Sequence, residues 1–295
     1  MRIGFLGLGA IGHPMAARLS RVHDVAVWNR TAERAQAFAA EHGALAAATP
    51  REAAAGREAV ITCLPTSAEV LALLEGPDGL EAGLGPGTLF LDCTSGDSAT
   101  TRRIAARLAA RGVAFADAPV SGGTNGAESG TLTVMVGGDR AVFERAVPVL
   151  QAFGKRIVHT GALGTGDAMK AVNNTLLALN ILGLAEGLTA LVKAGVAPRV
   201  AVETLNASSG RSFVSESLVP ERVLTGAWPV TFRLALLHKD VGICMGLLEE
   251  LGLPSPLLER VAAVLAESRA VLGETADYLE PIRLQERRVG VEIRG

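Results

Sequence analysis

Short apolar runs alternate with amphipathic segments over the first 160 residues of the chain. The runs rich in β-branched and aromatic residues lie at 2–6, 25–28, 59–64, 88–92, 113–118, 131–136 and 156–159. Between them, apolar residues recur at helical spacing, at 14–21, 32–42, 68–74, 99–110 and 140–152. This alternation predicts βαβ units and a Rossmann-like, doubly wound, mostly parallel sheet with helices on both faces.

The pattern changes after residue 160, where closely spaced glycines precede a long helical segment. That segment runs from about 167 to 194 and is apolar on most sides, which predicts burial in a domain core or between subunits. Further helices are predicted at 198–206, 232–251, 256–272 and 277–288, and no strong strand pattern accompanies them. We therefore expect a dinucleotide-binding domain at 1–160 and an all-α substrate and oligomerisation domain at 161–295.

Charge and hydropathy narrow the function class. The 295 residues carry a formal net charge of -2, and the chain has no block of Lys and Arg, so neither nucleic acid nor an anionic membrane is an expected partner. The most apolar later stretch, 175–185, is shorter than the roughly 20 residues that span a bilayer. The N-terminus lacks a signal-peptide pattern, and a cytoplasmic protein is expected.

Cysteine and histidine usage predicts no metal centre. Cys63, Cys93 and Cys244 are far apart and form no CxxC pair, which argues against a disulfide framework and structural zinc. His159 and His238 have no partners at metal-ligand spacing. A reduced compartment is therefore the expectation, with a small molecule as the partner.

A glycine-rich loop, Gly7-Leu8-Gly9-Ala10-Ile11-Gly12, lies between a predicted strand and a predicted helix. In such a loop the first glycine makes a tight turn, the second lets the backbone approach a pyrophosphate, and the third allows close helix packing. A GxGxxG alone is weak evidence, and a turn without a ligand is the alternative. The surrounding alternation favours dinucleotide binding.

The second predicted strand ends at Asn29-Arg30-Thr31, where NAD-preferring folds usually place a carboxylate for the ribose 2′-hydroxyl. Asn, Arg and Thr instead offer hydrogen-bond donors and a fixed positive charge, which suits a 2′-phosphate. We therefore predict NADP as the cofactor, with NAD possible. The alternative is a solvated turn with an incidental Arg.

Two later segments are rich in glycine and polar residues. The first, 117–127, follows a predicted strand, and its Ser121 hydroxyl and backbone N–H groups would suit a substrate carboxylate. The second, 164–174, opens the long helix and places Lys170 and Asn174 on one face. A lysine near a helix N-terminus meets an unfavourable dipole, which lowers its pKa and suits proton transfer. On spacing alone, however, a solvated lysine is the commoner case.

Four segments together resemble one enzyme family: residues 5–16 (FLGLGAIGHPMA), 117–123 with 130–138, 164–174, and the pair Lys239-Asp240. Over essentially its whole length the chain resembles the β-hydroxyacid dehydrogenases. Ile11 replaces the family's usual Met. The resemblance implies an NAD(P)-dependent oxidoreductase acting on the CH–OH of a short-chain, 3-hydroxyisobutyrate-like 3-hydroxy acid to give the semialdehyde. Separately, the apolar long helix predicts a homodimer or homotetramer, because a two-domain monomer need not bury it on every face.

The resemblance also implies residue roles. Lys170 would be the general acid/base, Asn174 would orient the substrate, and Ser121, Gly122 and Gly123 would hold its carboxylate. The residues expected near the cofactor, beyond the glycine loop and 29–31, are Leu64, Pro65, Thr94, Ser95 and Lys239. The pair Asp277-Tyr278 resembles a family element, but Leu279-Glu280 replaces its Ser-Ala, so its role stays open.

Several alternatives remain at this stage. The stretch 208–211 (SSGR) is similar to 3-hydroxyisobutyrate dehydrogenases, whereas 29–31 looks like the NADPH-dependent glyoxylate/succinic or tartronate semialdehyde reductases of the family. Imine reductases share the architecture but usually carry another residue at the position of Lys170. A non-catalytic dinucleotide sensor is the alternative of a different class, and intact Lys170 and Asn174 argue against it.

Overall fold

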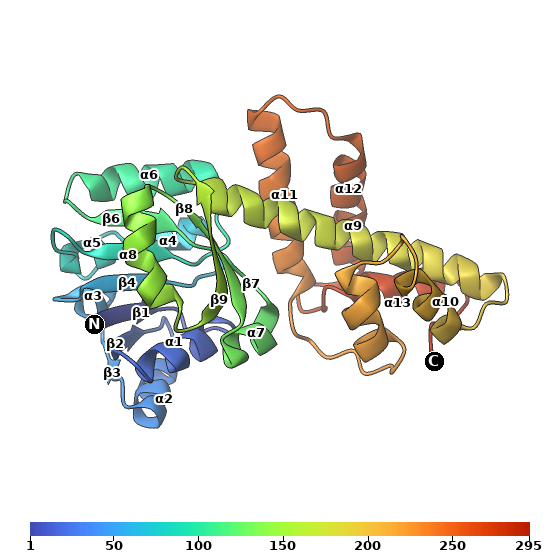
Figure 1. Cartoon of the computed structure of the whole chain (residues 1–295), viewed down its shortest axis with the longest axis horizontal. Coiled ribbons are helices and arrows are strands. Elements are labelled where there is room, and N and C mark those ends of the chain that lie inside the picture. The colour runs from blue at the N-terminus through green and yellow to red at the C-terminus, as the bar shows by residue number, and fades with distance from the viewer. The chain divides into compact units, whose positions relative to one another are not determined.

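The computed structural model describes residues 1–295 and separates into two compact units, Met1–Lys170 and Ala171–Gly295 (Figure 1). The last strand ends at Gly161 and the long helix α9 (Thr165–Lys193) begins shortly afterwards. The first unit is α/β and the second is all helical, so the predicted fold class is confirmed. The domain boundary near residue 160 stays a prediction.

Nine strands form the single sheet of the first unit, in the order β3-β2-β1-β4-β5-β6-β8-β7, with β9 beside β8. Neighbours from β3 to β6 are parallel, and β8 runs antiparallel to β6 and β7. The bounds are β1 (Arg2–Leu6), β2 (Asp24–Trp28), β3 (Leu45–Ala46), β4 (Ala59–Thr62), β5 (Leu89–Asp92), β6 (Ala114–Asp117), β7 (Val120–Ser121), β8 (Leu132–Gly137) and β9 (Gly154–Gly161).

Helices cover both faces of this sheet because side chains of successive strand residues point to opposite faces. Ile61 of β4 belongs to one apolar core with Met15 of α1, and α2 and α8 pack on the same face. Its neighbour Val60 belongs to the other core with Ile104 of α6, beside α3, α4 and α5. The bounds are α1 (Gly12–Ser20), α2 (Ala32–His42), α3 (Pro50–Ala54), α4 (Ser67–Leu73), α5 (Leu80–Gly83), α6 (Ser98–Ala109), α7 (Gly123–Ser129) and α8 (Arg140–Leu150).

The second unit consists of helices packed around one apolar core. Ile181 of α9, Leu237 of α11 and Leu265 of α12 are fully buried there. The remaining bounds are α10 (Pro198–Asn206), η1 (Val214–Val223), α11 (Leu234–Glu250), α12 (Pro256–Leu272) and α13 (Glu280–Val289). The only extended pairing is an isolated bridge between Arg233 and Asp277.

Short elements without a periodic apolar pattern were not predicted: β3, β7, α3, α5, α7 and the π-helix η1. Pro220 lies inside η1, and a proline removes an N–H donor and disfavours regular α-helix. The last helix, α13, begins at Glu280 rather than at 277. The carboxylate of Asp277 accepts the backbone N–H of Leu279 just before it.

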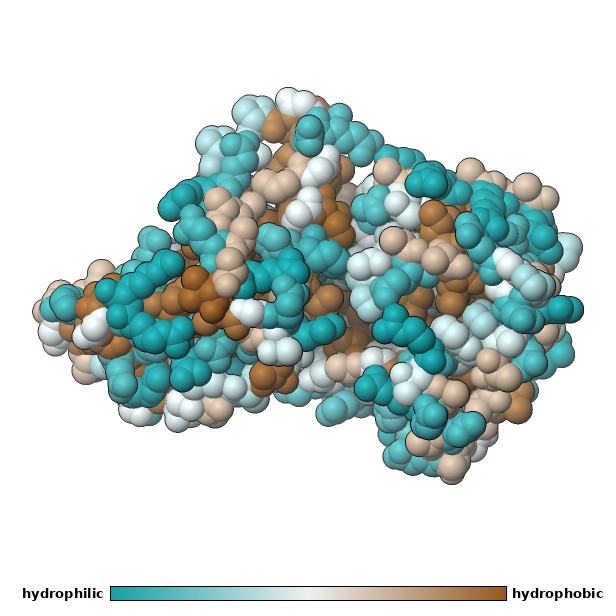
Figure 2. Space-filling view, turned by 180° about the vertical axis from the view of Figure 1, so that it is seen from behind, coloured by the Kyte–Doolittle hydropathy of each residue, from teal (hydrophilic) through white to brown (hydrophobic).

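The 29-residue helix α9 is long and apolar enough to cross a membrane by length and composition alone, a test that core helices also pass. One stripe of it, which includes Ala178, Ile181 and Leu188, is fully buried in the core of the second unit. The opposite side is uncovered within the chain, and Leu176 there is 47% exposed. Figure 2 shows apolar patches between polar side chains on the surface of the helical unit.

Candidate active site

The glycine loop has the backbone geometry that its sequence predicts. Gly7 has φ +107°, and a Cβ there would overlap the carbonyl oxygen of Cys63. A Cβ on Gly12 would overlap the carbonyl oxygen of Gly7. Around Gly9, in contrast, nothing lies within 4 Å of a Cβ position. The loop is therefore tight at both ends and open in its middle, which fits the close approach of a pyrophosphate at the start of α1.

Asn29 ties the end of β2 to this loop. Its Oδ1 accepts the backbone N–H of Leu8 at 3.0 Å, and its Nδ2 donates to the carbonyl of Thr31 at 3.1 Å. The Arg30 side chain is 87% exposed, and its guanidinium lies 3.8 Å from Glu69. Thr31 is the N-cap residue just before α2, and its side chain makes no capping bond. Asn29 thus positions the loop, while the Arg30 guanidinium and the Thr31 hydroxyl are the groups open to a ligand.

The ends of β4 and β5 are joined through a buried carboxylate. Asp92 Oδ1 accepts from the Thr62 hydroxyl at 2.8 Å and from the Thr94 backbone N–H at 3.0 Å. The Thr94 hydroxyl in turn accepts the backbone N–H of Leu64 at 3.0 Å. The structure therefore brings together the predicted cofactor-lining pairs 64–65 and 94–95, and Thr94 acts as their tie.

Burial raises the pKa of Asp92 from 3.8 to about 6, because the carboxylate loses hydration. A raised folded-state pKa contributes stability below about pH 4 that is lost as the pH rises through about 6. The shift corresponds to about 3 kcal/mol.

An Asp92→Asn variant keeps an oxygen acceptor for both hydrogen bonds and lacks the charge. We expect its unfolding free energy, relative to wild type, to rise by about that amount between pH 4 and 7 in urea titrations. If the unfolding free energies of the two proteins change with pH in parallel, this expectation is wrong.

A second buried carboxylate fixes the start of α9. Asp117, at the end of β6, accepts the backbone N–H of Gly164 at 2.8 Å and of Asp167 at 3.0 Å. A carboxylate in this place satisfies orphan donors and complements the helix dipole. A Cβ on Gly166 would overlap the Met135 carbonyl oxygen. The first turn of α9 is thus held tightly over the ends of β6 and β8.

A third carboxylate, Asp167, lies in that first turn and is 2% exposed. It accepts from the Thr101 hydroxyl at 2.6 Å and from the Gly96 backbone N–H at 3.2 Å. Burial, followed by the nearby charge of Asp117, raises the pKa of Asp167 well above its ordinary value. These bonds connect the turn that precedes Lys170 to the loop after β5 and to α6.

Lys170 and Asn174 lie one turn apart on α9, and they are 9% and 4% exposed. Asn174 Nδ2 donates to Asp240 Oδ2 at 2.6 Å, and its Oδ1 accepts from Asn173 at 3.1 Å. Lys239 Nζ lies 2.9 Å from Asp240 Oδ1. The carboxylate of Asp240, 2% exposed, therefore joins two of the predicted site residues, Asn174 and Lys239, in the helical unit.

Asp277 has a positioning role. Its carboxylate accepts the backbone N–H groups of Thr231 and Phe232 at 2.9 and 3.2 Å, just before α11 begins. It also lies 3.7 Å from the Arg222 guanidinium. Asp277 is 2% exposed, so it holds the chain that leads into the helix carrying Lys239 and contributes no open functional group.

The predicted carboxylate-binding loop is at the edge of the sheet. Ser121 ends β7 and pairs with Thr133 of β8. Gly122 and Gly123 follow with φ +136° and +65°, conformations that favour glycine. Both glycines are exposed and Ser121 is half-buried. The hydroxyl and backbone of this loop are accessible from solvent.

Two family models cover most of the chain. One, described as the NAD binding domain of 6-phosphogluconate dehydrogenase, matches residues 2–161. The other, described as NAD-binding of NADP-dependent 3-hydroxyisobutyrate dehydrogenase, matches residues 164–285. The chain belongs to the β-hydroxyacid dehydrogenase family. It is an NAD(P)-dependent hydroxyacid dehydrogenase resembling 3-hydroxyisobutyrate dehydrogenase.

The chain is similar to relatives that are named for different substrates. The chain is 37% identical to 2-(hydroxymethyl)glutarate dehydrogenase of Eubacterium barkeri, over 100% of this chain and 98% of that one. It is 38% identical to the NAD-dependent L-serine dehydrogenase of Pseudomonas aeruginosa, over 82% and 83%. The solved 3-hydroxyisobutyrate dehydrogenase of Mycobacterium tuberculosis with L-serine superposes with a TM-score of 0.87 at 31% identity, covering 96% and 98%.

Sequence reasoning singled out the pair Lys239-Asp240 but did not predict the burial and hydrogen bonds of the four carboxylates that position these groups, Asp92, Asp117, Asp167 and Asp240. The sequence does point to two of them, because Asp92 and Asp117 lie at the ends of apolar strand patterns, and α/β sheets bind ligands at that edge. For Asp167 and Asp240, spacing along the chain gave no sign of burial or of partners 66 residues or more away.

Proposed function

We propose that this dehydrogenase oxidises the primary alcohol of a 3-hydroxyisobutyrate-like 3-hydroxy acid to its semialdehyde, with NADP. The three relatives are named for 2-(hydroxymethyl)glutarate, L-serine and 3-hydroxyisobutyrate. Each compound has a hydroxymethyl group on the carbon that carries a carboxylate, and they differ only in the third substituent. The same core is the proposed substrate unit here.

The observation that carries this proposal is the buried Lys170 one turn from Asn174, on a helix start anchored by Asp117. As the C–H hydride leaves the alcohol carbon and its C=O bond forms, the Nζ of Lys170 accepts the hydroxyl proton. In the reverse direction the same group returns the proton. Asn174 orients the hydroxyl, and Ser121 with Gly122 and Gly123 binds the carboxylate through its hydroxyl and N–H groups.

The glycine loop fits a dinucleotide, because the space around Gly9 is open to a pyrophosphate while Gly7 and Gly12 are closely packed against the backbone. When bound, the nicotinamide supplies the hydride acceptor. The loop Gly7-Leu8-Gly9-Ala10-Ile11-Gly12 receives the pyrophosphate, with Asn29 holding the loop in place. The remaining residues assigned to the cofactor are Arg30, Thr31, Leu64, Pro65, Thr94, Ser95 and Lys239.

Cofactor choice is tested at Arg30. An Arg30→Gln variant should raise KM for NADP about 10- to 100-fold, because a charge-assisted bond to the 2′-phosphate is worth roughly 1.5–3 kcal/mol. KM for NAD should stay the same, since NAD has no such phosphate. Initial rates with both cofactors measure this, and Arg140→Gln, an exposed arginine of α8 paired with Glu144, is the control. Equal losses for both cofactors, or a wild-type preference for NAD, would exclude the assigned role.

Two other functions remain as alternatives. NADPH-dependent reduction of glyoxylate, succinic semialdehyde or tartronate semialdehyde uses the same lysine as a proton donor, and the 29–31 segment is the feature that favours it. A non-catalytic dinucleotide sensor needs no buried Lys170. Turnover of any hydroxy acid separates the sensor from both enzymes.

A substrate panel tests the proposed function directly. For oxidation with NADP, the panel contains 3-hydroxyisobutyrate, 2-(hydroxymethyl)glutarate, L-serine, 3-hydroxypropionate and glycerate. For reduction with NADPH, it contains glyoxylate, succinic semialdehyde and tartronate semialdehyde. We expect the highest kcat/KM for 3-hydroxyisobutyrate. If glyoxylate or succinic semialdehyde reduction exceeds every oxidation by tenfold or more at matched pH, the reductase alternative replaces the proposal.

We also propose a homodimer or homotetramer in the cytoplasm. The uncovered side of α9, with Leu176 and Met169 about half exposed, supports self-association. Cys63, Cys93 and Cys244 are all free thiols, which fits a reducing compartment.

A further inference from the structure

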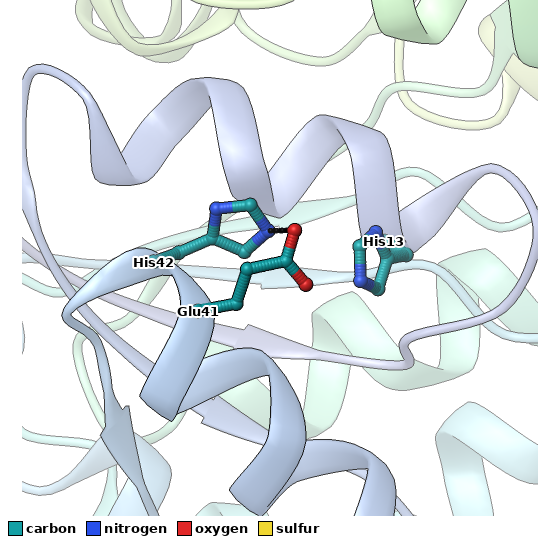
Figure 3. Close-up of side chains that lie close together, drawn as sticks. All are labelled: His13, Glu41 and His42. Carbon is teal, nitrogen blue, oxygen red and sulfur yellow. Dashed lines mark ion pairs between the residues drawn. The ribbon is translucent and has the colours of Figure 1, made fainter.

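Two histidines and a glutamate converge on the surface of the first unit (Figure 3). His13 is the second residue of α1, and Glu41 and His42 end α2. One ligand atom from each lies within 4.8 Å of the other two. The His42 Nε2 to Glu41 Oε1 distance is 3.6 Å, and the two imidazole centroids are 5.6 Å apart. Glu41 and His42 come 28 and 29 positions after His13 in the sequence, and the fold brings the three side chains together.

The two imidazoles are held by packing on one buried ring. Phe38, 1% exposed, lies 5.1 Å from His13 and 4.5 Å from His42, centroid to centroid. This contact restrains both histidine side chains. The Glu41 side chain, in contrast, is 67% exposed and can change its rotamer. Two nitrogen ligands restrained by packing and one adjustable carboxylate are therefore available.

His42 Nε2 is buried and has no hydrogen-bond partner. A buried polar atom in this state costs free energy unless something binds it. Figure 3 shows the atom facing the Glu41 carboxylate, with His13 on the other side of that carboxylate. A cation between the three side chains would take up the nitrogen lone pair.

We propose that His13, Glu41 and His42 form a site for a divalent transition-metal ion, with Zn²⁺ as the best match, outside the dehydrogenase chemistry. Two imidazoles and a carboxylate are a common zinc ligand set, with water in the fourth position. Metal–ligand bonds of about 2.0–2.1 Å place tetrahedral ligand atoms roughly 3.4 Å apart. The three ligand atoms lie within 4.8 Å of one another, so binding requires the side chains to move together by at most about 1.4 Å. Mg²⁺, which prefers oxygen ligands, should not bind.

The bound ion would connect the start of α1 to the end of α2. His13 directly follows Gly12, the last glycine of the dinucleotide loop, and its backbone N–H donates to Gly9 at 2.9 Å. Because the ion binds only the folded arrangement, it stabilises the first unit against unfolding. It takes no part in proton or hydride transfer.

The experiment uses the full chain, without an affinity tag and after chelator treatment. We expect Zn²⁺ to bind with one equivalent and micromolar affinity in calorimetry, and to raise the melting temperature. Co²⁺ should give the visible absorption of a tetrahedral site. His13→Gln, His42→Gln and Glu41→Gln should each weaken Zn²⁺ binding about tenfold or more. Glu41→Gln changes only an exposed side chain, so it keeps the test informative if a histidine variant fails to fold.

The matched control is His159→Gln. His159 is a partly buried histidine of the same unit, and its Nε2 already lies 2.7 Å from the Gly138 carbonyl oxygen. Its replacement should leave Zn²⁺ affinity unchanged. The proposal is overturned if wild type binds only at millimolar Zn²⁺, if Mg²⁺ binds equally well, or if the three cluster variants retain wild-type affinity. In those cases Glu41 and His42 form only an ion pair.

Discussion

Replacement of Lys170 by alanine should lower kcat about 10³-fold, because a positioned general acid/base typically contributes 10²- to 10⁴-fold. Dinucleotide affinity should change little, since the loop Gly7–Gly12 is held by contacts that do not include Lys170. Single-turnover kinetics with 3-hydroxyisobutyrate and NADP would measure the chemical step, and fluorescence titration would measure NADPH binding. A small primary amine added to the alanine variant should restore part of the rate.

Two further variants separate proton transfer from charge and from helix effects. Lys170→Arg keeps a positive charge but cannot give up a proton near neutral pH, so it should be almost as slow as the alanine variant. Lys193→Ala removes an exposed lysine at the other end of α9, which donates to the Val289 carbonyl, and should keep wild-type kcat. If Lys170→Ala turns over near the wild-type rate, the assigned mechanism is wrong.

The fold was largely predictable because its long elements have strong apolar patterns. Strands such as β1 and helices such as α12 match their predicted ranges, since buried strands and amphipathic helices differ clearly in period. The strands β3 and β7 have two residues each, too few for a period to show. The helix α7, with the sequence GTNGAES, has almost no apolar residues to form a pattern. The π-helix η1 was missed because Pro220 disfavours the regular α-helix that periodicity detects.

The candidate site was predictable to the extent that short motifs specify it. The glycines of the loop need particular backbone angles and space, so their residue type carries the information. The carboxylates around α9 differ in this respect. Asp117 and Asp240 act through partners more than 40 residues away, and a lone Asp in a sequence is most often solvated. Only the tertiary structure shows that they are buried and bonded.

The second large effect is expected at Asp240. An Asp240→Ala variant should lose about 10²-fold in kcat/KM, because removal of the carboxylate leaves the Asn174 amide and the Lys239 ammonium without their shared partner. Asp240→Asn keeps an oxygen that can accept from Asn174, so its loss should be smaller. Steady-state kinetics at saturating NADP would measure both, and Glu249→Gln, an exposed acid on the same helix, is the control.

A double-mutant cycle shows whether Asp240 acts through Asn174. If it does, Asn174→Ala combined with Asp240→Ala should be no slower than the slower single variant, since the second change removes a bond that is already absent. Independent roles would instead multiply the two losses. A general loss of stability would lower the concentration of active enzyme and leave KM and the pH profile of kcat unchanged. A changed pH profile in Asp240→Asn, with full occupancy by titration, therefore identifies positioning of the catalytic groups rather than folding as the function of this buried carboxylate.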